Sequence, residues 1–83
     1  MTNRVLFFGR PADRLGPGMD VEVPSGGCTV GELRARLIGQ GEAFAEALDR
    51  PDVRASVDVR IVDDSATVRP GQEVAFFSPF SGG

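Results

Sequence analysis

The stretch VAFF at residues 74–77 decides the fold, together with its counterpart VLFF at residues 5–8. Each is a run of four apolar, β-favouring residues, which is typical of a strand that is covered on both faces. One run lies near the start of the 83-residue chain and the other lies near its end. We therefore expect the first and last strands of the domain to form the centre of its sheet.

The chain between these two runs contains further strand patterns separated by turns. Residues 19–23 (MDVEV) alternate apolar and polar side chains, and residues 55–62 (ASVDVRIV) are expected to form one continuous alternating strand. Val68 marks a brief additional strand. Residues 9–18 are rich in proline and glycine, which predicts a loop. Pro70-Gly71 has the signature of a type II turn before the last strand.

One main helix is predicted in the middle of the chain. Thr29 and Glu32 have the spacing of a capping box, in which each side chain bonds the backbone of the other residue. The following apolar residues share one helix face: Val30, Leu33 and Leu37. Arg34 and Arg36 are expected on the solvent side. Residues 44–48 form an alanine-rich turn or a short second helix.

This order of elements predicts an α+β domain in which the main helix packs on one face of a sheet. The arrangement is that of a β-grasp (ubiquitin-like) roll, with a mixed sheet of four to five strands. We assign residues 1–80 to this domain and residues 81–83 to a flexible Gly-Gly tail.

The composition excludes several classes of function. The net charge of -3 argues against non-specific nucleic-acid binding, which needs a cationic surface. The chain has no histidine, which excludes Ser-His and Cys-His catalysis within it as well as histidine-based metal sites. The single cysteine excludes an internal disulfide and suits a reducing compartment. No apolar run approaches the ~20 residues of a membrane span. We expect a soluble, cytoplasmic protein that does not bind a membrane, a metal or a cofactor.

Cys28 and the pair Asp63-Asp64 can each be interpreted as a reactive site or as an ordinary structural feature. Cys28 precedes the main helix, and the N-terminus of a helix can lower the pKa of a thiol. An incidental loop cysteine is the interpretation that we favour. Asp63-Asp64 could mark a metal or acid–base site, but turn chemistry favours a solvated turn.

The C-terminal Gly82-Gly83 is the part of the chain that is best suited to take part in a reaction. Two residues without Cβ can enter a narrow channel in another protein, and the Gly83 carboxylate can be activated there as an adenylate. That mixed anhydride is open to attack by a sulfur nucleophile. Pro79 cannot donate to a sheet ladder and would release the chain from the sheet. On these residues alone, a carrier function and an accidental Gly-Gly are equally open.

Four segments together resemble a known family: VAFFSPFSGG (74–83), VLFFG (5–9), TVGEL (29–33) and PGQEV (70–74). The family is that of the molybdopterin synthase small subunits, the MoaD-type sulfur carriers, and the resemblance covers the whole chain. Ser78 stands where the family has the first of two prolines, and Phe80 replaces a smaller residue. Ala12-Asp13 stands where many members have Arg-Glu.

The resemblance implies a β-grasp fold and a role as a sulfur donor that is not catalytic alone. A ubiquitin-activating-like enzyme would use ATP to adenylate Gly83, and sulfuration would give a thiocarboxylate, with Gly82 needed to thread the tail. The large synthase subunit, in a heterotetramer, would then pass the sulfur to cyclic pyranopterin monophosphate.

The resemblance and the fold together suggest a partner surface. Side chains alternate across a strand, so Phe8 and Phe77 would share the sheet face that the helix leaves open. The hydrophobic contact of the family with its large subunit falls at matching positions, with Ile61 as a third member and Phe80 as an added anchor. Alternatively, these phenylalanines are core residues covered by the second helix or by a loop.

Three other functions remain open on the sequence. A related carrier could feed sulfur to thiazole, cysteine or tRNA, and a ubiquitin-like modifier could be joined to lysines of other proteins. A β-grasp binding module with an inert tail is the third.

Overall fold

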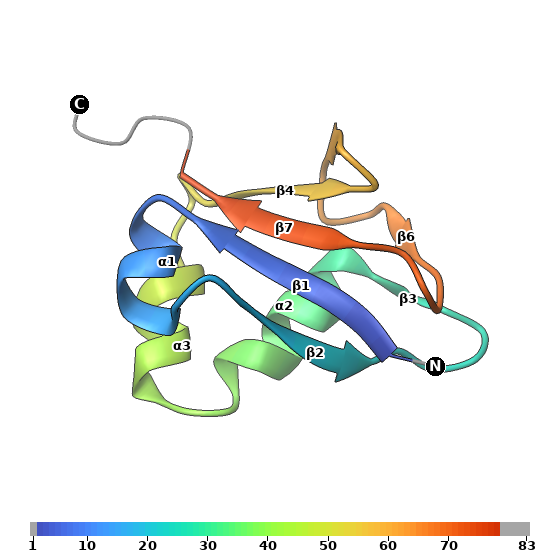
Figure 1. The fold of residues 1–83 in the computed structure, drawn as a ribbon, viewed down its shortest axis with the longest axis horizontal. Coiled ribbons are helices and arrows are strands. Elements are labelled where there is room, and N and C mark those ends of the chain that lie inside the picture. The colour runs from blue at the N-terminus through green and yellow to red at the C-terminus, as the bar shows by residue number, and fades with distance from the viewer. Residues whose placement is uncertain (1, 79–83) are drawn as a thin grey trace.

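A mixed sheet with the strand order β2-β1-β7-β4-β5 forms the body of the computed structural model, which describes residues 2–78 (Figure 1). The five strands are β1 (Thr2–Phe8), β2 (Gly18–Glu22), β4 (Arg54–Val57), β5 (Arg60–Val62) and β7 (Val74–Phe77). The central strand β7 pairs in parallel with β1 and in antiparallel with β4. The predicted β-grasp sheet with its first and last strands at the centre is therefore confirmed.

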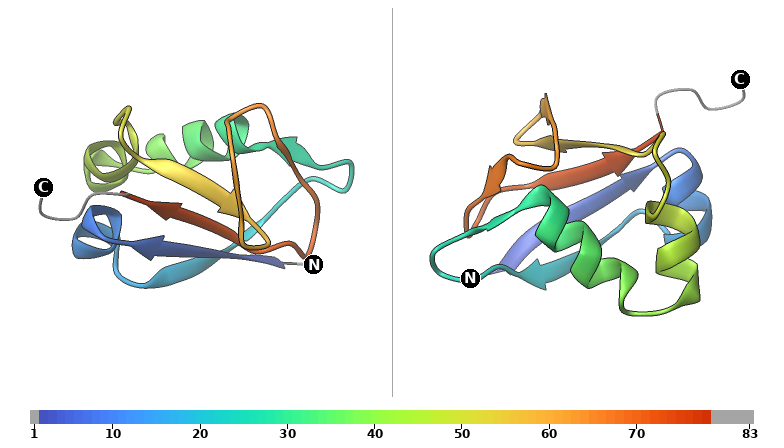
Figure 2. Two further views of the ribbon diagram at one scale, coloured as in Figure 1. Left: turned by 90° about the horizontal axis from the view of Figure 1, so that it is seen from above. Right: turned by 180° about the vertical axis from the view of Figure 1, so that it is seen from behind.

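Three helices and a small second sheet complete the fold. The helices are α1 (Arg10–Leu15), α2 (Val30–Ile38) and α3 (Glu42–Leu48), and the second sheet pairs β3 (Cys28–Thr29) with β6 (Thr67–Val68). Figure 1 looks onto the sheet from the side opposite α2, and the right-hand view of Figure 2 shows α2 in front of the sheet. None of the helices within residues 2–78 has the length and apolar character needed to cross a membrane.

The core lies between α2 and the sheet. Leu33 and Leu37 of α2 are fully buried, as is Phe76 of β7. The ring of Phe7 stacks with that of Phe76, with 6.5 Å between the ring centroids. These contacts follow from the two predicted patterns, because both the helix spacing and the strand alternation place these side chains on the shared interior.

The predicted start of α2 is confirmed in atomic detail. The Thr29 hydroxyl accepts a hydrogen bond from the Glu32 N–H at 3.0 Å, and the Glu32 carboxylate accepts one from the Thr29 N–H at 2.8 Å. A capping box of this kind satisfies two backbone donors that have no partner inside the helix.

The prediction that residues 9–18 form a loop is wrong, because α1 occupies most of this stretch. Pro11 lies in the first turn of the helix, where its fixed φ suits a helix and its missing N–H costs nothing. Pro11 is buried, and Ala12 and Leu15 pack against the core. Tertiary packing of these apolar side chains therefore outweighs the low helix propensity of the segment.

The prediction of one continuous strand over residues 55–62 is also wrong. Asp58 and Val59 have φ values of 48° and 72°, and they form a two-residue loop between β4 and β5. Positive φ at both central residues marks a type I′ hairpin turn. The alternating pattern runs unbroken through this turn, so hydrophobic periodicity alone gives no sign of it.

Arg34 differs from its predicted position on the solvent side of α2. Its guanidinium lies over the ring of Phe76, 5.3 Å from the ring centroid, and donates a hydrogen bond to the Leu48 carbonyl at 3.0 Å. The long apolar stem lets the charged group reach across the helix surface to these partners. Arg36 is exposed, as predicted.

Candidate functional site

An aromatic pair lies on the face of the sheet that the helices leave open. The parallel register pairs Phe8 of β1 with Phe77 of β7, and the antiparallel register places Arg54 of β4 opposite Phe77. Phe8 is 52% exposed, whereas Phe77 is half-buried. The neighbouring residues Phe7 and Phe76 point into the core, as strand alternation requires. The alternative that Phe8 and Phe77 are core residues is therefore wrong for Phe8.

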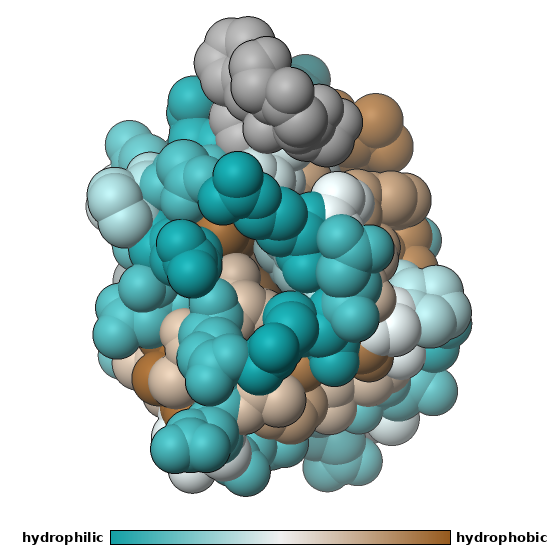
Figure 3. Space-filling view, turned by 90° about the vertical axis from the view of Figure 1, so that its left-hand side faces the viewer, coloured by the Kyte–Doolittle hydropathy of each residue, from teal (hydrophilic) through white to brown (hydrophobic). Residues whose placement is uncertain are grey.

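Ile61 lies on the same open face, two strands away from Phe77. It is paired with Ser56, whose neighbours Ala55 and Val57 are both buried on the helix side. Ile61 is 63% exposed. We call the following residues the open-face patch: Leu6, Phe8, Ile61, Ala75 and Phe77. Figure 3 shows hydrophobic side chains gathered along its right-hand edge, which is the side of the open sheet face.

The patch reaches the point where the chain leaves the sheet. Because β1 and β7 are parallel, both end at the same edge, and Ser78 follows directly after Phe77. Ser78 is buried beside Gly9, where an added Cβ would lie 3.5 Å from the Ser78 carbonyl oxygen. The φ of Gly9 is +67°, which favours glycine, whereas a Cβ beside Ser78 would make only ordinary van der Waals contact. The parallel pairing places the end of β7 next to Phe8.

The predicted roles of the tail concern residues outside the described ones. Gly82, Gly83, Phe80 and Pro79 follow residue 78, as does the domain boundary placed after residue 80. The roles of Gly82 and Gly83 as the reacting end, and of Phe80 as an anchor, therefore stay predictions. Partner binding by Phe8, Phe77 and Ile61 also stays a prediction, although their exposure is now known.

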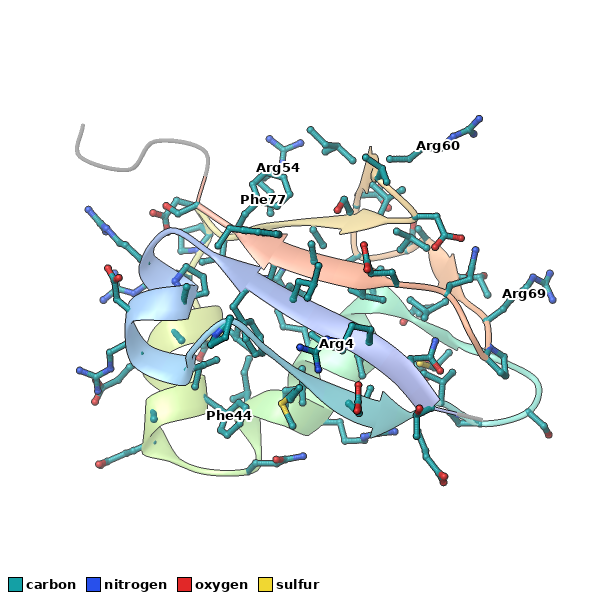
Figure 4. The ribbon with its side chains drawn as sticks, in the orientation of Figure 1. Arg4, Phe44, Arg54, Arg60, Arg69 and Phe77 are labelled. Carbon is teal, nitrogen blue, oxygen red and sulfur yellow. The ribbon has the colours of Figure 1, made fainter. Side chains whose placement is uncertain are left out.

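The charges on the open face are arranged unevenly. Arg4 forms an ion pair with Asp20 of β2, with 3.3 Å between nitrogen and oxygen. Arg54 has no carboxylate within 4.0 Å among residues 2–78, and it lies next to Phe77 at the other end of the sheet (Figure 4). Close to the end of β7, the open-face patch is therefore bordered by a positive charge that no carboxylate of residues 2–78 pairs with.

Cys28 lies in the short strand β3, not in a loop, and is half-buried. Burial raises the pKa of its thiol, the Glu32 carboxylate raises it further, and the opposing influence of Arg36 is smaller. A raised pKa leaves less thiolate at neutral pH, so the structure supports the interpretation of Cys28 as an unreactive residue.

Asp63 and Asp64 form part of a turn, as predicted. The Asp63 carboxylate accepts hydrogen bonds from the hydroxyl and the N–H of Ser65, and both bonds hold the pKa of Asp63 below its usual value. Asp64 accepts a hydrogen bond from Arg34 at 3.0 Å. Within residues 2–78, no three histidine, cysteine or acidic side chains come together as metal ligands would.

A shallow hollow of about 340 Å³ lies between α3, β4 and the turn that holds Asp63. Its walls mix arginines with carboxylates: Arg34, Asp49, Arg50, Arg54, Asp63 and Asp64. Because the opposite charges are interspersed, the hollow does not concentrate a charge of one sign, and it is a poor match for an anion or a metal ion.

A model of the ThiS family matches residues 5–83 of the sequence. The chain belongs to the ThiS family. The match includes the strands that carry the open-face patch and the Gly82-Gly83 end. It confirms the family resemblance drawn from the sequence.

Two relatives agree with this assignment. The chain is 34% identical over 80 residues to the molybdopterin synthase sulfur carrier subunit of Escherichia coli (strain K12), and the match covers 96% of this chain and 98% of that protein. It is 27% identical to the protein of the same name from Haemophilus influenzae, over 95% of this chain and 96% of the relative.

The fold of this ThiS family member matches that of solved structures. The crystal structure of SAMP1 from Haloferax volcanii superposes over all of both chains with a TM-score of 0.81, at 22% sequence identity. At this identity the likeness supports the β-grasp fold and nothing more specific.

Two residues of the site escaped the sequence reasoning. Arg54 precedes the strand that was expected over residues 55–62, and only the register with β7 places it beside Phe77. Val59 was part of an alternating pattern, but it lies at the tip of a hairpin and is 89% exposed. An Asp-Gly or Asn-Gly pair would have marked this turn in the sequence, whereas Asp58-Val59 gives no such signal.

Proposed function

We propose that this chain is the sulfur-carrier subunit of a molybdopterin synthase and that Gly83 carries the sulfur. Both relatives bear this function in their names and match nearly the whole chain. The structural observation that supports it best is the pairing of Phe8 with Phe77, which places apolar surface beside the end of β7. A carrier needs this combination, because docking of the body must bring the chain end to the partner's active site.

The proposed chemistry begins with activation by an adenylating enzyme. A Gly83 carboxylate oxygen attacks the α-phosphorus of ATP and forms an acyl adenylate, and pyrophosphate leaves. A sulfur nucleophile at the oxidation level of sulfide then attacks the acyl carbon and expels AMP. The product is a Gly83 thiocarboxylate, and no net oxidation occurs at the carbon.

The second stage takes place on the large subunit of the synthase. The thiocarboxylate sulfur attacks a carbon of cyclic pyranopterin monophosphate and displaces an oxygen substituent of that carbon, which leaves with the bonding electron pair. Water then attacks the acyl carbon and cleaves the acyl–sulfur bond, so that the sulfur stays on the pterin and Gly83 returns to the carboxylate. We place the acid–base groups on the large subunit, because this chain has no histidine. In the proposed heterotetramer the two carriers lie at opposite ends. Because a dithiolene contains two sulfurs and each thiocarboxylate donates one, two charged carriers are used for each product molecule.

Two variants test separate parts of this proposal in a reconstituted reaction with the large subunit and the precursor. Gly82→Ala leaves the body of the domain untouched, and we expect an unchanged Tm but a roughly 100-fold loss of transfer, because an added Cβ misplaces the reacting group. Phe8→Ala removes a docking side chain, and we expect about 10-fold weaker binding with near-normal transfer at saturation.

The outcome also separates the other functions left open by the sequence. Normal transfer by the Gly82→Ala carrier would contradict the proposal. A wild-type thiocarboxylate that fails to convert the precursor but thiolates another acceptor would indicate a carrier of another pathway. Isopeptide adducts of Gly83 in the native host would indicate a protein modifier.

A further inference from the structure

Val59 combines two unfavourable features at the tip of the β4–β5 hairpin. Its side chain is 89% exposed, and its φ of 72° lies in the left-handed region. A β-branched residue rarely adopts this region, because its Cβ substituents crowd the backbone. Glycine is the preferred residue at this position of a type I′ turn.

The surrounding structure holds this turn without help from Val59. The Asp58 carboxylate accepts hydrogen bonds from the Gln72 side chain and from the Glu73 N–H, both at 2.9 Å. The Asp58 N–H donates to the Glu73 carbonyl at 2.8 Å. A strained residue persists where neighbouring contacts fix its conformation in this way. The fold therefore gives a reason for the turn but no reason for a valine in it.

The hairpin tip lies close in sequence to Ile61 of the open-face patch. Strand β4 runs from Arg54, beside Phe77, to the turn at Asp58, a distance of about 13 Å at the usual rise per residue of a strand. Ile61 lies between these two points on the neighbouring strand β5. Val59 thus lies at the far end of β4 from Phe77, two residues before Ile61 in the sequence.

A stable partner needs more surface than Phe8, Phe77 and Ile61 supply. A standard protein interface buries about 800 Å² on each partner, which is about one sixth of the 4856 Å² surface of this chain. Three partly exposed side chains provide only a fraction of that area. Val59 is the large hydrophobic residue with the greatest exposure in residues 2–78, and it lies two residues from Ile61 in the sequence.

The charges around the tip argue against a second copy of this chain as the occupant. Arg54, which the register places beside Phe77 on the open face, has no carboxylate within 4.0 Å among the described residues (Figure 4). Arg60 is paired with Val57 and so lies on the opposite face of the hairpin. A symmetric dimer through the open face would place two copies of the Arg54 guanidinium in one interface. A different protein with an apolar pocket rimmed by carboxylates fits the surface better.

We propose that Val59 is a specificity contact that inserts into an apolar pocket of the large synthase subunit, with acidic groups of that subunit facing Arg54. This inference rests on the proposed function. The valine destabilises the turn in the free carrier but strengthens binding to the large subunit, which explains both its strain and its exposure.

The test replaces Val59 with residues that suit the turn. Val59→Gly and Val59→Asn relieve the backbone strain, so we expect the Tm of the free carrier to rise by a few degrees. We expect the Kd for the large subunit to weaken about 10-fold, because a buried valine is lost from the interface. Glu22→Ala, on the opposite edge strand β2, is the matched surface control and should leave both values unchanged.

The measurements are Tm by calorimetry, Kd by titration calorimetry, and mass in solution by sedimentation. A raised Tm with an unchanged Kd would overturn the inference while leaving the proposed function intact. Weaker binding only to the adenylating enzyme, or a wild-type dimer that Val59→Asn converts to a monomer, would overturn the choice of occupant. Failure of the wild-type carrier to bind the large subunit at all would instead count against the proposed function.

Discussion

Asn3 is the residue that fixes the turn before β7. It is fully buried in β1, and its Nδ2 donates hydrogen bonds to the carbonyls of Arg69 and Gln72 at 2.8 and 2.9 Å. These carbonyls enclose the Pro70-Gly71 turn, in which Gly71 has the positive φ of a type II turn. The register of β7, and with it the position of Phe77, therefore depends on one side chain at the start of the chain.

We expect Asn3→Ala to lower the free energy of unfolding by about 2 kcal/mol, because two part-buried backbone carbonyls lose the side-chain donor and only the Arg69 carbonyl keeps another one, the Gln72 N–H. Denaturant unfolding measures this loss. Asn3→Asp has the same shape but presents a carboxylate to the two carbonyls. Burial should raise its pKa in the folded state, so its stability should fall as the pH rises from acidic to neutral.

A stability of Asn3→Ala within about 0.5 kcal/mol of the wild type would contradict this account. So would an Asn3→Asp variant that is more stable at neutral than at acidic pH.

At the scale of elements, Arg34 joins three parts of the fold that the sequence separates. Its guanidinium bonds the last residue of α3 through the Leu48 carbonyl and the turn after β5 through Asp64, and it covers Phe76 of β7. A planar group with several donors suits this geometry, whereas a lysine ammonium does not.

We expect Arg34→Lys to lower the free energy of unfolding by about 1–2 kcal/mol, because the charge is kept but the hydrogen bonds and the stacking are not. Arg36→Lys is the matched control on the same helix, where the side chain is exposed. Its stability should change by less than about 0.5 kcal/mol in the same denaturation experiment. Equal stabilities of the two variants would contradict the role given to Arg34.

The elements that were predicted correctly are those whose signal is local. The run VLFF, the run VAFF, the capping box at Thr29 and the Pro70-Gly71 turn each depend on residues close together in the sequence. The parallel pairing of Phe8 with Phe77 has no local signal. It was predicted from the fold class, in which the first and last strands are parallel neighbours.

The wrong predictions concern elements that tertiary contacts decide. Helix α1 contains a proline and lies between glycines, and only the burial of Pro11 and the packing of Leu15 explain its formation. The turn at Val59 is held by Asp58, whose partners lie 14 and 15 residues further along the chain. Patterns over a short window do not contain these contacts, so the exposed hairpin tip could not be found from the sequence.

At the scale of the whole molecule, the two faces of the sheet differ: one is packed in the core and the other exposes apolar side chains. One face packs against α2 and holds the core, while the other exposes Phe8 and Ile61. The parallel pair β1 and β7 ends at the edge where the open-face patch lies, so in the proposed function the same two strands position both the docking surface and the start of the chain end. We propose that this chain supplies one reacting carboxylate and that its partners supply the remaining catalytic groups.

The most direct test of the proposed sulfur transfer is the intact mass of the protein purified from its native host under sulfur-replete conditions. We predict a fraction in which one oxygen is exchanged for sulfur, located at Gly83 by fragmentation. This fraction should return to the carboxylate mass after incubation with the large subunit and the pterin precursor. Finding the carboxylate alone, with the adenylating enzyme present and active, would contradict the claim that Gly83 carries sulfur.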